Sequence, residues 1–205
     1  MSKNIIIIGA GGHAKVIADI ITKSDDNLIG FLDDNLDIQN KTIYLDKKVI
    51  GTIKDIDKYK ECYFIIGIGN NNIRENIANT YNLKWHTVIH PSAIIANEVS
   101  IGEGSVVMAG AIVNPGTKIG KHCIINTKSS LDHDSIIENY VHISPGATLA
   151  GTVHIKEKTW ICAGVTIINN IKVAKNNIVG AGAVVIKDIK EENGTYVGVP
   201  ARKIK

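Results

Sequence analysis

The chain has 205 residues, 44% of them apolar, which suffices for the core of one large or two small domains and excludes wholesale disorder. Its formal net charge of +3 is too small for a nucleic-acid-binding surface, so we expect no nucleic-acid partner. The three cysteines are far apart, and the only N-terminal apolar run, residues 5–8, is too short for a signal sequence or a membrane span. These features predict a soluble protein of the reducing cytoplasm.

The first 88 residues predict a small parallel α/β domain. Apolar runs predict strands at residues 5–8, 28–32 and 63–68, and helical periodicity predicts helices at residues 14–22 and 73–81. A turn containing Gly9, Gly11 and Gly12 joins the first strand to the first helix and offers backbone N–H groups to a phosphate. The next strand ends at Asp33 and Asp34, whose carboxylates can accept hydrogen bonds from ribose hydroxyls.

This glycine turn also fits a dinucleotide-binding fingerprint, with Ala14 at its third position. However, 88 residues make only about half of a full doubly wound domain. A phosphate-binding turn indicates a phosphate and not a hydride transfer. We therefore favour a nucleotide-linked sugar over a nicotinamide cofactor as the ligand of this domain.

From residue 89 to residue 185, every sixth residue is aliphatic, which makes 17 positions because (185 − 89)/6 + 1 = 17. Neither a helix nor an ordinary strand has this period, and a six-residue repeat is typical of a β-solenoid. The phase never slips, so we expect a continuous solenoid over residues 89–190 and a separate C-terminal tail over residues 191–205.

The repeat resembles that of the hexapeptide-repeat transferases, whose left-handed parallel β-helix has three hexads, or eighteen residues, per coil. Five segments occur in the same order as in the sialic acid O-acetyltransferase and UDP-4-amino-sugar N-acetyltransferase family, at residues 9–13, 31–34, 67–71, 131–134 and 196–201. The resemblance implies a Rossmann-like acceptor domain followed by the β-helix. It also implies a homotrimer that uses acetyl-CoA in bacterial surface-glycan synthesis, with the chemistry between adjacent β-helices. We expect no metal, because the histidine spacing does not fit a zinc site.

Acyl transfer from a thioester needs a base within reach of the nucleophile. His133 is at a hexad position that points away from the aliphatic column, and Asp134 beside it could orient the ring and raise its basicity. In the resembling family, the histidine at this point of the motif is the general base, and the adjacent carboxylate is usually a glutamate. Asp134 is shorter, and Asp132 is a competitor for the same task.

The remaining site residues follow from the resemblance and from their positions. His13, Gly69 and Asn70 are expected to join the glycine turn and the Asp33–Asp34 pair in binding the acceptor. The acetyl-CoA site is expected to include His142, Gly151, Ala163 and, in the basic tail, Arg202. His142 lies half a coil after His133, so the two could meet only across a trimer seam.

The acceptor is the least determined part of this prediction. A sialic acid would bring its carboxylate near Asp33 and Asp34, with compensation only if the fold brought Arg74 or Lys15 there. We therefore expect N-acetylation of a nucleotide-linked 4-amino sugar, with sialic acid O-acetylation as the alternative.

Two other classes of hexad protein remain possible. A zinc carbonic anhydrase needs histidines near multiples of eighteen, whereas those from His122 to His154 are separated by 11, 9 and 12 residues. A non-enzymatic solenoid would leave the glycine turn and the His133–Asp134 pair without a role.

Overall fold

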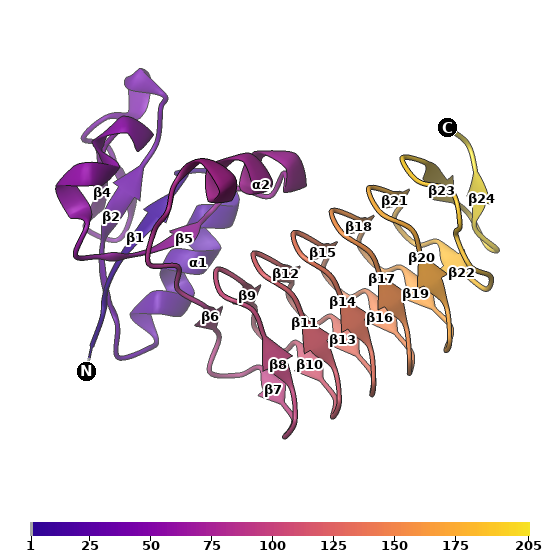
Figure 1. Cartoon of the computed structure of the whole chain (residues 1–205). Helices are drawn as coiled ribbons and strands as arrows, with labels where there is room; N and C mark the ends of the chain where they lie inside the picture. Colours follow the sequence, from indigo (N-terminus) through magenta and orange to yellow (C-terminus); the bar gives the residue numbers. More distant parts are fainter. Residues whose placement is uncertain (1) are drawn as a thin grey trace.

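The computed structural model describes residues 2–205 and contains an α/β region followed by a stack of triangular coils (Figure 1). The α/β region consists of β1 (Asn4–Ile8), α1 (Gly12–Thr22), β2 (Asn27–Leu32), the 3-10 helix η1 (Leu36–Ile38), β3 (Thr42–Tyr44), β4 (Lys47–Gly51), the 3-10 helix η2 (Ile53–Tyr59), β5 (Tyr63–Ile66) and α2 (Asn71–Thr80). The sheet order is β3-β4-β2-β1-β5, and only β3 is antiparallel to its neighbour.

Strand β1, which lies between β2 and β5, is buried on both faces, which explains its unbroken run of isoleucines. Ile5 and Ile7 pack with α1, whereas Ile6 and Ile8 pack with α2 and η2 on the opposite face. This alternation follows from the two-residue period of a strand. The predicted parallel α/β domain is therefore present, with β3, β4 and the two 3-10 helices added between the expected strands.

The coils are built from short parallel strands. They are β6 (Val88–Ile89), β7 (Ile94–Ile95), β8 (Ser100–Ile101), β9 (Val106–Val107), β10 (Ile112–Val113), β11 (Lys118–Ile119), β12 (Ile124–Ile125), β13 (Ser130–Leu131), β14 (Ile136–Ile137), β15 (His142–Ile143), β16 (Thr148–Leu149), β17 (His154–Ile155), β18 (Trp160–Ile161), β19 (Thr166–Ile167), β20 (Lys172–Val173), β21 (Ile178–Val179) and β22 (Val184–Val185). Two further strands, β23 (Thr195–Val197) and β24 (Arg202–Lys203), follow them.

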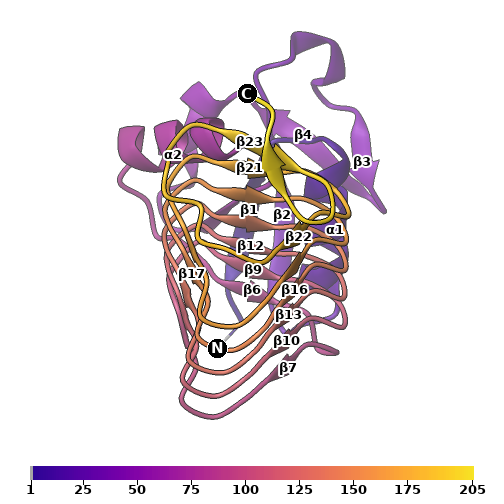
Figure 2. The same cartoon turned by 90° about the vertical axis from the view of Figure 1, so that its right-hand side faces the viewer.

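From β6 to β22, each coil pairs with the next at an offset of eighteen residues, as in Val113 opposite Leu131. Three sheets result. The first runs from β7 to β22, the second from β8 to β20 and the third from β6 to β21, each in steps of three strands, and β23 and β24 extend the third sheet. Figure 2 shows the coils stacked behind one another. The prediction of a left-handed parallel β-helix is confirmed.

The aliphatic column fills the interior of the β-helix, and its members from Val107 to Val185 are almost completely buried. Burying an aliphatic side chain of this size stabilises the fold by about 1.5–3 kcal/mol. The column is less protected at its start, where Ile89 is 41% exposed and Ile95 is partly buried, because no coil lies beneath the first one.

The outward side of the third sheet joins the two regions. Val88, Val106 and Ile124, which are eighteen residues apart, are buried against the cluster that includes α1. The next members of this outward column are His142, Trp160 and Ile178. The α/β region therefore covers the early coils and leaves an uncovered strip beyond them, over which the N-terminal end of α2 lies (Figures 1 and 2).

The last residues close the far end of the stack. β23 continues the third sheet beside β21, and β24 returns antiparallel to β23. Within residues 2–205, no helix is both long and apolar enough to span a bilayer.

Candidate active site

His133 lies at the turn between β13 and β14, on the edge of the prism opposite the third sheet. Its Nδ1 donates a hydrogen bond of 2.8 Å to Oδ2 of Asp134, and its backbone N–H donates to Oδ1 of Asp132 at 2.8 Å. The two carboxylates therefore have separate tasks: Asp134 orients the ring, and Asp132 holds the backbone. Asn114, one coil earlier, donates to Oδ1 of Asp132 at 2.8 Å and fixes it in turn.

The ring of His133 lies against Gly151 of the following coil. A Cβ built on Gly151 would lie 2.5 Å from Nε2 of His133, so a side chain there would obstruct this nitrogen. Nε2 is left available because Nδ1 is engaged by Asp134, and the side chain is 57% exposed. An available Nε2 with an oriented Nδ1–H is the arrangement that a general base requires.

The hydrogen bond to Asp134 raises the pKa of His133, and the nearby negative charge of Asp132 adds to the increase. The amide of Asn114 lowers the pKa of Asp132, which keeps that carboxylate ionised. Both effects favour a proton on the imidazole, so His133 is a stronger base than an isolated histidine.

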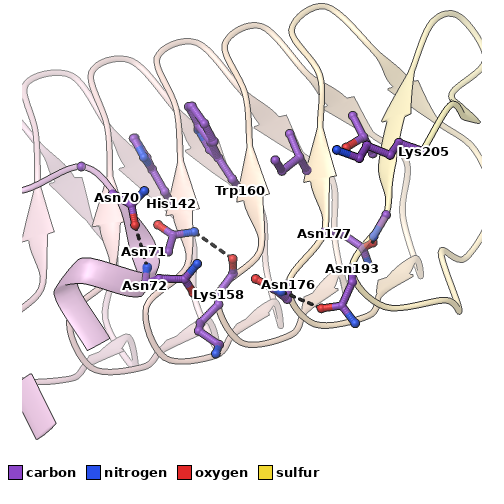
Figure 3. A pocket seen from close by; sticks show the side chains of 14 residues that line it. Asn70, Asn71, Asn72, His142, Lys158, Trp160, Asn176, Asn177, Asn193 and Lys205 are labelled. Carbon is purple, nitrogen blue, oxygen red and sulfur yellow. Dashed lines mark hydrogen bonds between the residues drawn. The ribbon is translucent and has the colours of Figure 1, made fainter. Parts of the chain in front are cut away.

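A second imidazole, His142, lines a pocket of about 560 Å³ on the outward side of the third sheet (Figure 3). Its ring stacks on Trp160 with a centroid distance of 5.8 Å, and its Nε2 is 3.1 Å from Nδ2 of Asn126. The indole N–H of Trp160 donates to Oγ of Ser144 at 2.8 Å, which fixes the platform. Trp160 is nevertheless 43% exposed and can contact a ligand.

The other wall of this pocket comes from the α/β region. The loop after β5 brings Gly69 and Asn70 to the pocket, and Asn70 caps α2 by accepting hydrogen bonds from the backbone N–H groups of Asn72 and Ile73. Asn71 donates to the carbonyl oxygen of Lys158 at 2.8 Å and ties the loop to the β-helix. Figure 3 shows these side chains facing the strip that carries His142 and Trp160.

Arg74 in α2 fastens the two regions together from behind the pocket. It is 1% exposed, and its guanidinium donates to the carbonyl oxygens of His122 and Tyr140 in the β-helix and of Ile68 and Gly69 in the loop. It also donates to Oδ1 of Asn71. Burial lowers the pKa of Arg74 to about 10, so the group stays charged near neutral pH.

This buried charge acts on the imidazoles beside it. Burial, assisted by the charge of Arg74, lowers the pKa of His142 to about 3 and that of His13 to about 4. Nδ1 of His142 and Nε2 of His13 are buried and have no hydrogen-bond partner among the described residues. Both rings are neutral and each retains one unpaired nitrogen, which a bound polar group can satisfy.

The glycine turn and the Asp33–Asp34 pair meet at the carboxyl edge of the N-terminal sheet, where ligands bind in open parallel sheets. Gly9 has a φ of +98°, and a Cβ there would lie 2.7 Å from the side chain of Ile68. Gly11 precedes α1 and Gly12 begins it, with open space around both. A ligand can therefore approach the first backbone N–H groups of α1.

The two carboxylates also have structural tasks. Oδ2 of Asp33 accepts from the backbone N–H of Ala10 at 2.8 Å, and Oδ1 of Asp34 accepts from that of Ile53 at 2.9 Å. Asp33 thus braces the glycine turn directly. Because the backbone N–H of Ala10 is already paired with Asp33, only the N–H groups after Ala10 can bind an anion.

The residues expected around acetyl-CoA do not line one pocket within a single chain. His142 lies in the pocket beside Gly69, whereas Gly151 lies against His133. Ala163 is exposed in the turn after β18, and Arg202 lines a separate pocket of about 140 Å³ near the end of the stack. A surface made from two chains would be needed to bring them together.

Several site residues were not predicted from the sequence. Trp160 could have been found, since it is eighteen residues after His142 and therefore stacks on it. Asn126 and Ser144 could be recognised as site residues only from the structure. Their role lies in hydrogen bonds to His142 and Trp160, which no sequence pattern reveals. Among residues 2–205, no three histidine, cysteine or carboxylate side chains form a group that could hold a metal ion.

The fold and the His133–Asp134 pair define a hexapeptide-repeat acyltransferase, and known proteins agree. Residues 4–81 match the family described as the PglD N-terminal domain. The acetyltransferase domain of PglB from Neisseria gonorrhoeae, solved with acetyl coenzyme A, is 35% identical with a TM-score of 0.92, and each chain covers 100% of the other. PerB from Caulobacter crescentus, solved with CoA and GDP-perosamine, is 30% identical with a TM-score of 0.91, over 98% of this chain and 97% of that one.

The chain belongs to the family of hexapeptide-repeat sugar acetyltransferases. A curated relative, UDP-N-acetylbacillosamine N-acetyltransferase of Bacillus subtilis, is 41% identical over 114 residues, which are 51% of this chain and 51% of the relative. The match therefore spans about half the length of that protein.

Proposed function

We propose that this protein transfers the acetyl group of acetyl-CoA to the amino group of a nucleotide-linked 4-amino sugar in bacterial surface-glycan synthesis. The observation that carries the proposal is the exposed His133, whose Nδ1 is held by Asp134 and whose Nε2 is free. The relatives named for amino-sugar N-acetylation and those solved with CoA or acetyl coenzyme A support the same donor and acceptor class.

His133 performs the proton transfer in this mechanism. Bound acetyl-CoA would supply an activated thioester. Nε2 of His133 accepts the proton that the sugar amine loses as its nitrogen bonds to the acetyl carbon, and it can return this proton to the departing sulfur. Asp134 stabilises the positive charge that develops on the imidazole between the two transfers.

The site requires a second chain. His133 lies on the edge between the first two sheets, whereas the His142 pocket lies on the third sheet, so the body of one prism separates them. We infer a homotrimer with threefold symmetry in which the His133 edge of one chain faces the His142 pocket of the next. His142, Gly151, Ala163 and Arg202 would then share one acetyl-CoA groove.

The acceptor would bind at the carboxyl edge of the N-terminal sheet. We propose that the backbone around Gly11, Gly12 and His13 receives the diphosphate, that Asp33 and Asp34 face the nucleoside, and that Gly9 shapes the turn. Gly69 and Asn70 extend this surface toward the His142 pocket. Both nucleotides in the relatives' names, UDP and GDP, fit this chemistry.

The surroundings of Arg74 favour N-acetylation over sialic acid O-acetylation. A sialic acid carboxylate near Asp33 and Asp34 would need a cation, but the guanidinium of Arg74 already donates to five oxygens of the chain.

The three cysteines are unpaired, which supports the reducing cytoplasm as the place of the reaction.

The direct test measures acetyl-CoA consumption with UDP- and GDP-linked 4-amino sugars, with their 4-hydroxy counterparts, and with free and CMP-linked sialic acids. We expect turnover only with the amino sugars. Turnover confined to sialic acids would show that the acceptor is a sialic acid and not an amino sugar. The absence of turnover with every acceptor would contradict the acetyltransferase proposal.

A mixing experiment tests the shared site. We expect His133→Ala and His142→Ala chains each to have little activity alone. Co-expressed, they should form mixed trimers in which some interfaces combine an intact His133 with an intact His142, and activity should partly return. Sedimentation should show a trimer, and a fully active monomer would refute the assembly.

A further inference from the structure

The carboxylate of Asp134 occupies space that the preceding coil leaves empty. Gly116 is eighteen residues before Asp134 and lies at the same turn of that coil. A Cβ built on Gly116 would be only 2.4 Å from Oδ1 of Asp134, a separation that real Cβ atoms do not show. Any side chain at position 116 would have to displace the carboxylate or the turn.

The conformation of the turn does not explain the glycine. Gly116 has a φ of +76°, but the equivalent turn residues in other coils also have positive φ and carry side chains: Glu98 (+63°), Asp134 (+57°), Thr152 (+61°) and Asn170 (+61°). Among these five stacked positions, only the one beneath the Asp134 carboxylate is a glycine. The side chain is therefore absent at the one position where it would collide with the Asp134 carboxylate.

Asp134 has little freedom to move away from such a side chain. Its backbone N–H donates to the carbonyl oxygen of Pro115 at 3.0 Å, which fixes its main chain to the preceding coil. Its side chain is short, and Oδ2 must stay 2.8 Å from Nδ1 of His133 to keep the hydrogen bond. Displacing Oδ1 would turn the whole carboxylate and lengthen that bond.

We propose that Gly116 is a positioning residue for His133, because the absence of its side chain lets the short carboxylate of Asp134 reach the imidazole. This inference rests on the proposed function of His133 as the base. The charged groups that act on the ring from its own turn are Asp134 and Asp132, and the adjoining coils contribute the neutral residues Asn114, Gly116 and Gly151.

Gly116→Ala tests this inference, with Gly110→Ala as the matched control. Gly110 has a similar φ of +67°, and a Cβ there would meet only the Lys128 side chain at 3.4 Å. Both variants place an alanine at a positive φ and should lower the melting temperature, and the collision with Asp134 should add to the decrease in Gly116→Ala. Only Gly116→Ala should also lower kcat, by about tenfold, because only this variant disturbs the base.

A double-mutant cycle with Asp134→Gly shows whether the effect passes through the carboxylate. Glycine tolerates the positive φ at position 134 and removes the group that would collide. If Gly116 acts through Asp134, adding Gly116→Ala to Asp134→Gly should lower kcat by no more than about twofold. Independent, multiplying effects of the two substitutions would overturn the inference.

An NMR titration of the His133 imidazole gives a readout that does not depend on turnover. We expect the His133 pKa to fall toward its ordinary value in Gly116→Ala and in Asp134→Gly, but not in Gly110→Ala. An unchanged titration in Gly116→Ala would overturn the positioning role. If the wild type acetylates none of the sugars but the titrations behave as expected, the proposed function fails while the positioning inference stands.

Discussion

His133 and His142 show how one residue type acquires opposite properties in two parts of the same β-helix. His133 is exposed on an edge of the prism beside two carboxylates, and its pKa is raised. His142 is buried on the third sheet near the charge of Arg74, and its pKa is lowered to about 3. The first ring is a stronger base than an ordinary histidine, whereas the second remains a neutral hydrogen-bonding group.

Removing the edge imidazole should have the largest effect. We expect His133→Ala to lower kcat by about 10² to 10⁴-fold, with acetyl-CoA affinity nearly unchanged, because proton transfer is lost and the groove is not. Steady-state kinetics and calorimetric titration with acetyl-CoA would measure the two quantities.

The matched control for this variant is His154→Ala. His154 also pairs with a carboxylate, through Nε2 and Oε1 of Glu138 at 2.6 Å, but it lies on the second sheet away from the candidate site. An equal decrease of kcat in both variants would show that the His133–Asp134 pair has no special role in catalysis.

Buried neutral imidazoles should make the fold sensitive to acid. Burial lowers the pKa of His122 to about 4, so the unfolded chain binds more protons than the folded one as the pH falls from about 6.5 to 4, and stability decreases through that window. His122→Phe can keep the stacking on Tyr140 and should reduce the loss of unfolding free energy between pH 7 and pH 4.5 by about 2 kcal/mol.

Urea unfolding at the two pH values would measure this difference. His133→Phe is the control, since the pKa of His133 is shifted upward and its removal should leave the acid-induced loss in place. The same pH dependence in His122→Phe as in the wild type would show that His122 does not contribute.

The aromatic platform in the pocket should matter for binding more than for chemistry. We expect Trp160→Ala to raise a substrate KM by about tenfold with a smaller change in kcat, because it removes a stacking surface and leaves the base intact. Trp160→Phe should recover most of the loss, and Ile112→Ala, on the first sheet, is the control. A decrease in kcat with an unchanged KM would show that Trp160 acts in catalysis and not in binding.

The smallest expected effect concerns the position of the pH profile. Because the hydrogen bond to Asp134 raises the pKa of His133, the acidic limb of kcat/KM should lie above the ordinary histidine value. Asp134→Asn should move that limb to lower pH and reduce the plateau several-fold. An unchanged limb would indicate that Asp132 or a residue of another chain controls the base.

The main features of the fold can be predicted from the sequence. The six-residue period predicts the β-helix, its continuity and its inward column, because stacked coils must present an aliphatic residue at each repeat. The glycine turn and the strand patterns likewise predict the parallel α/β domain. Helix α1 nevertheless begins at Gly12 and not at residue 14, since both Gly12 and His13 adopt the helical conformation.

The sequence predicted the His133–Asp134 pair, whereas the positions of Gly151 beside the His133 ring and of Gly116 beside the Asp134 carboxylate came from the structure. Only the tertiary structure decided which carboxylate holds the ring, because the Asp134 carboxylate lies 2.8 Å from Nδ1 in the space over Gly116. It also decided the state of His142. Burial and the nearby charge of Arg74 come from residues distant in sequence, so no local pattern around His142 could reveal that it is held neutral.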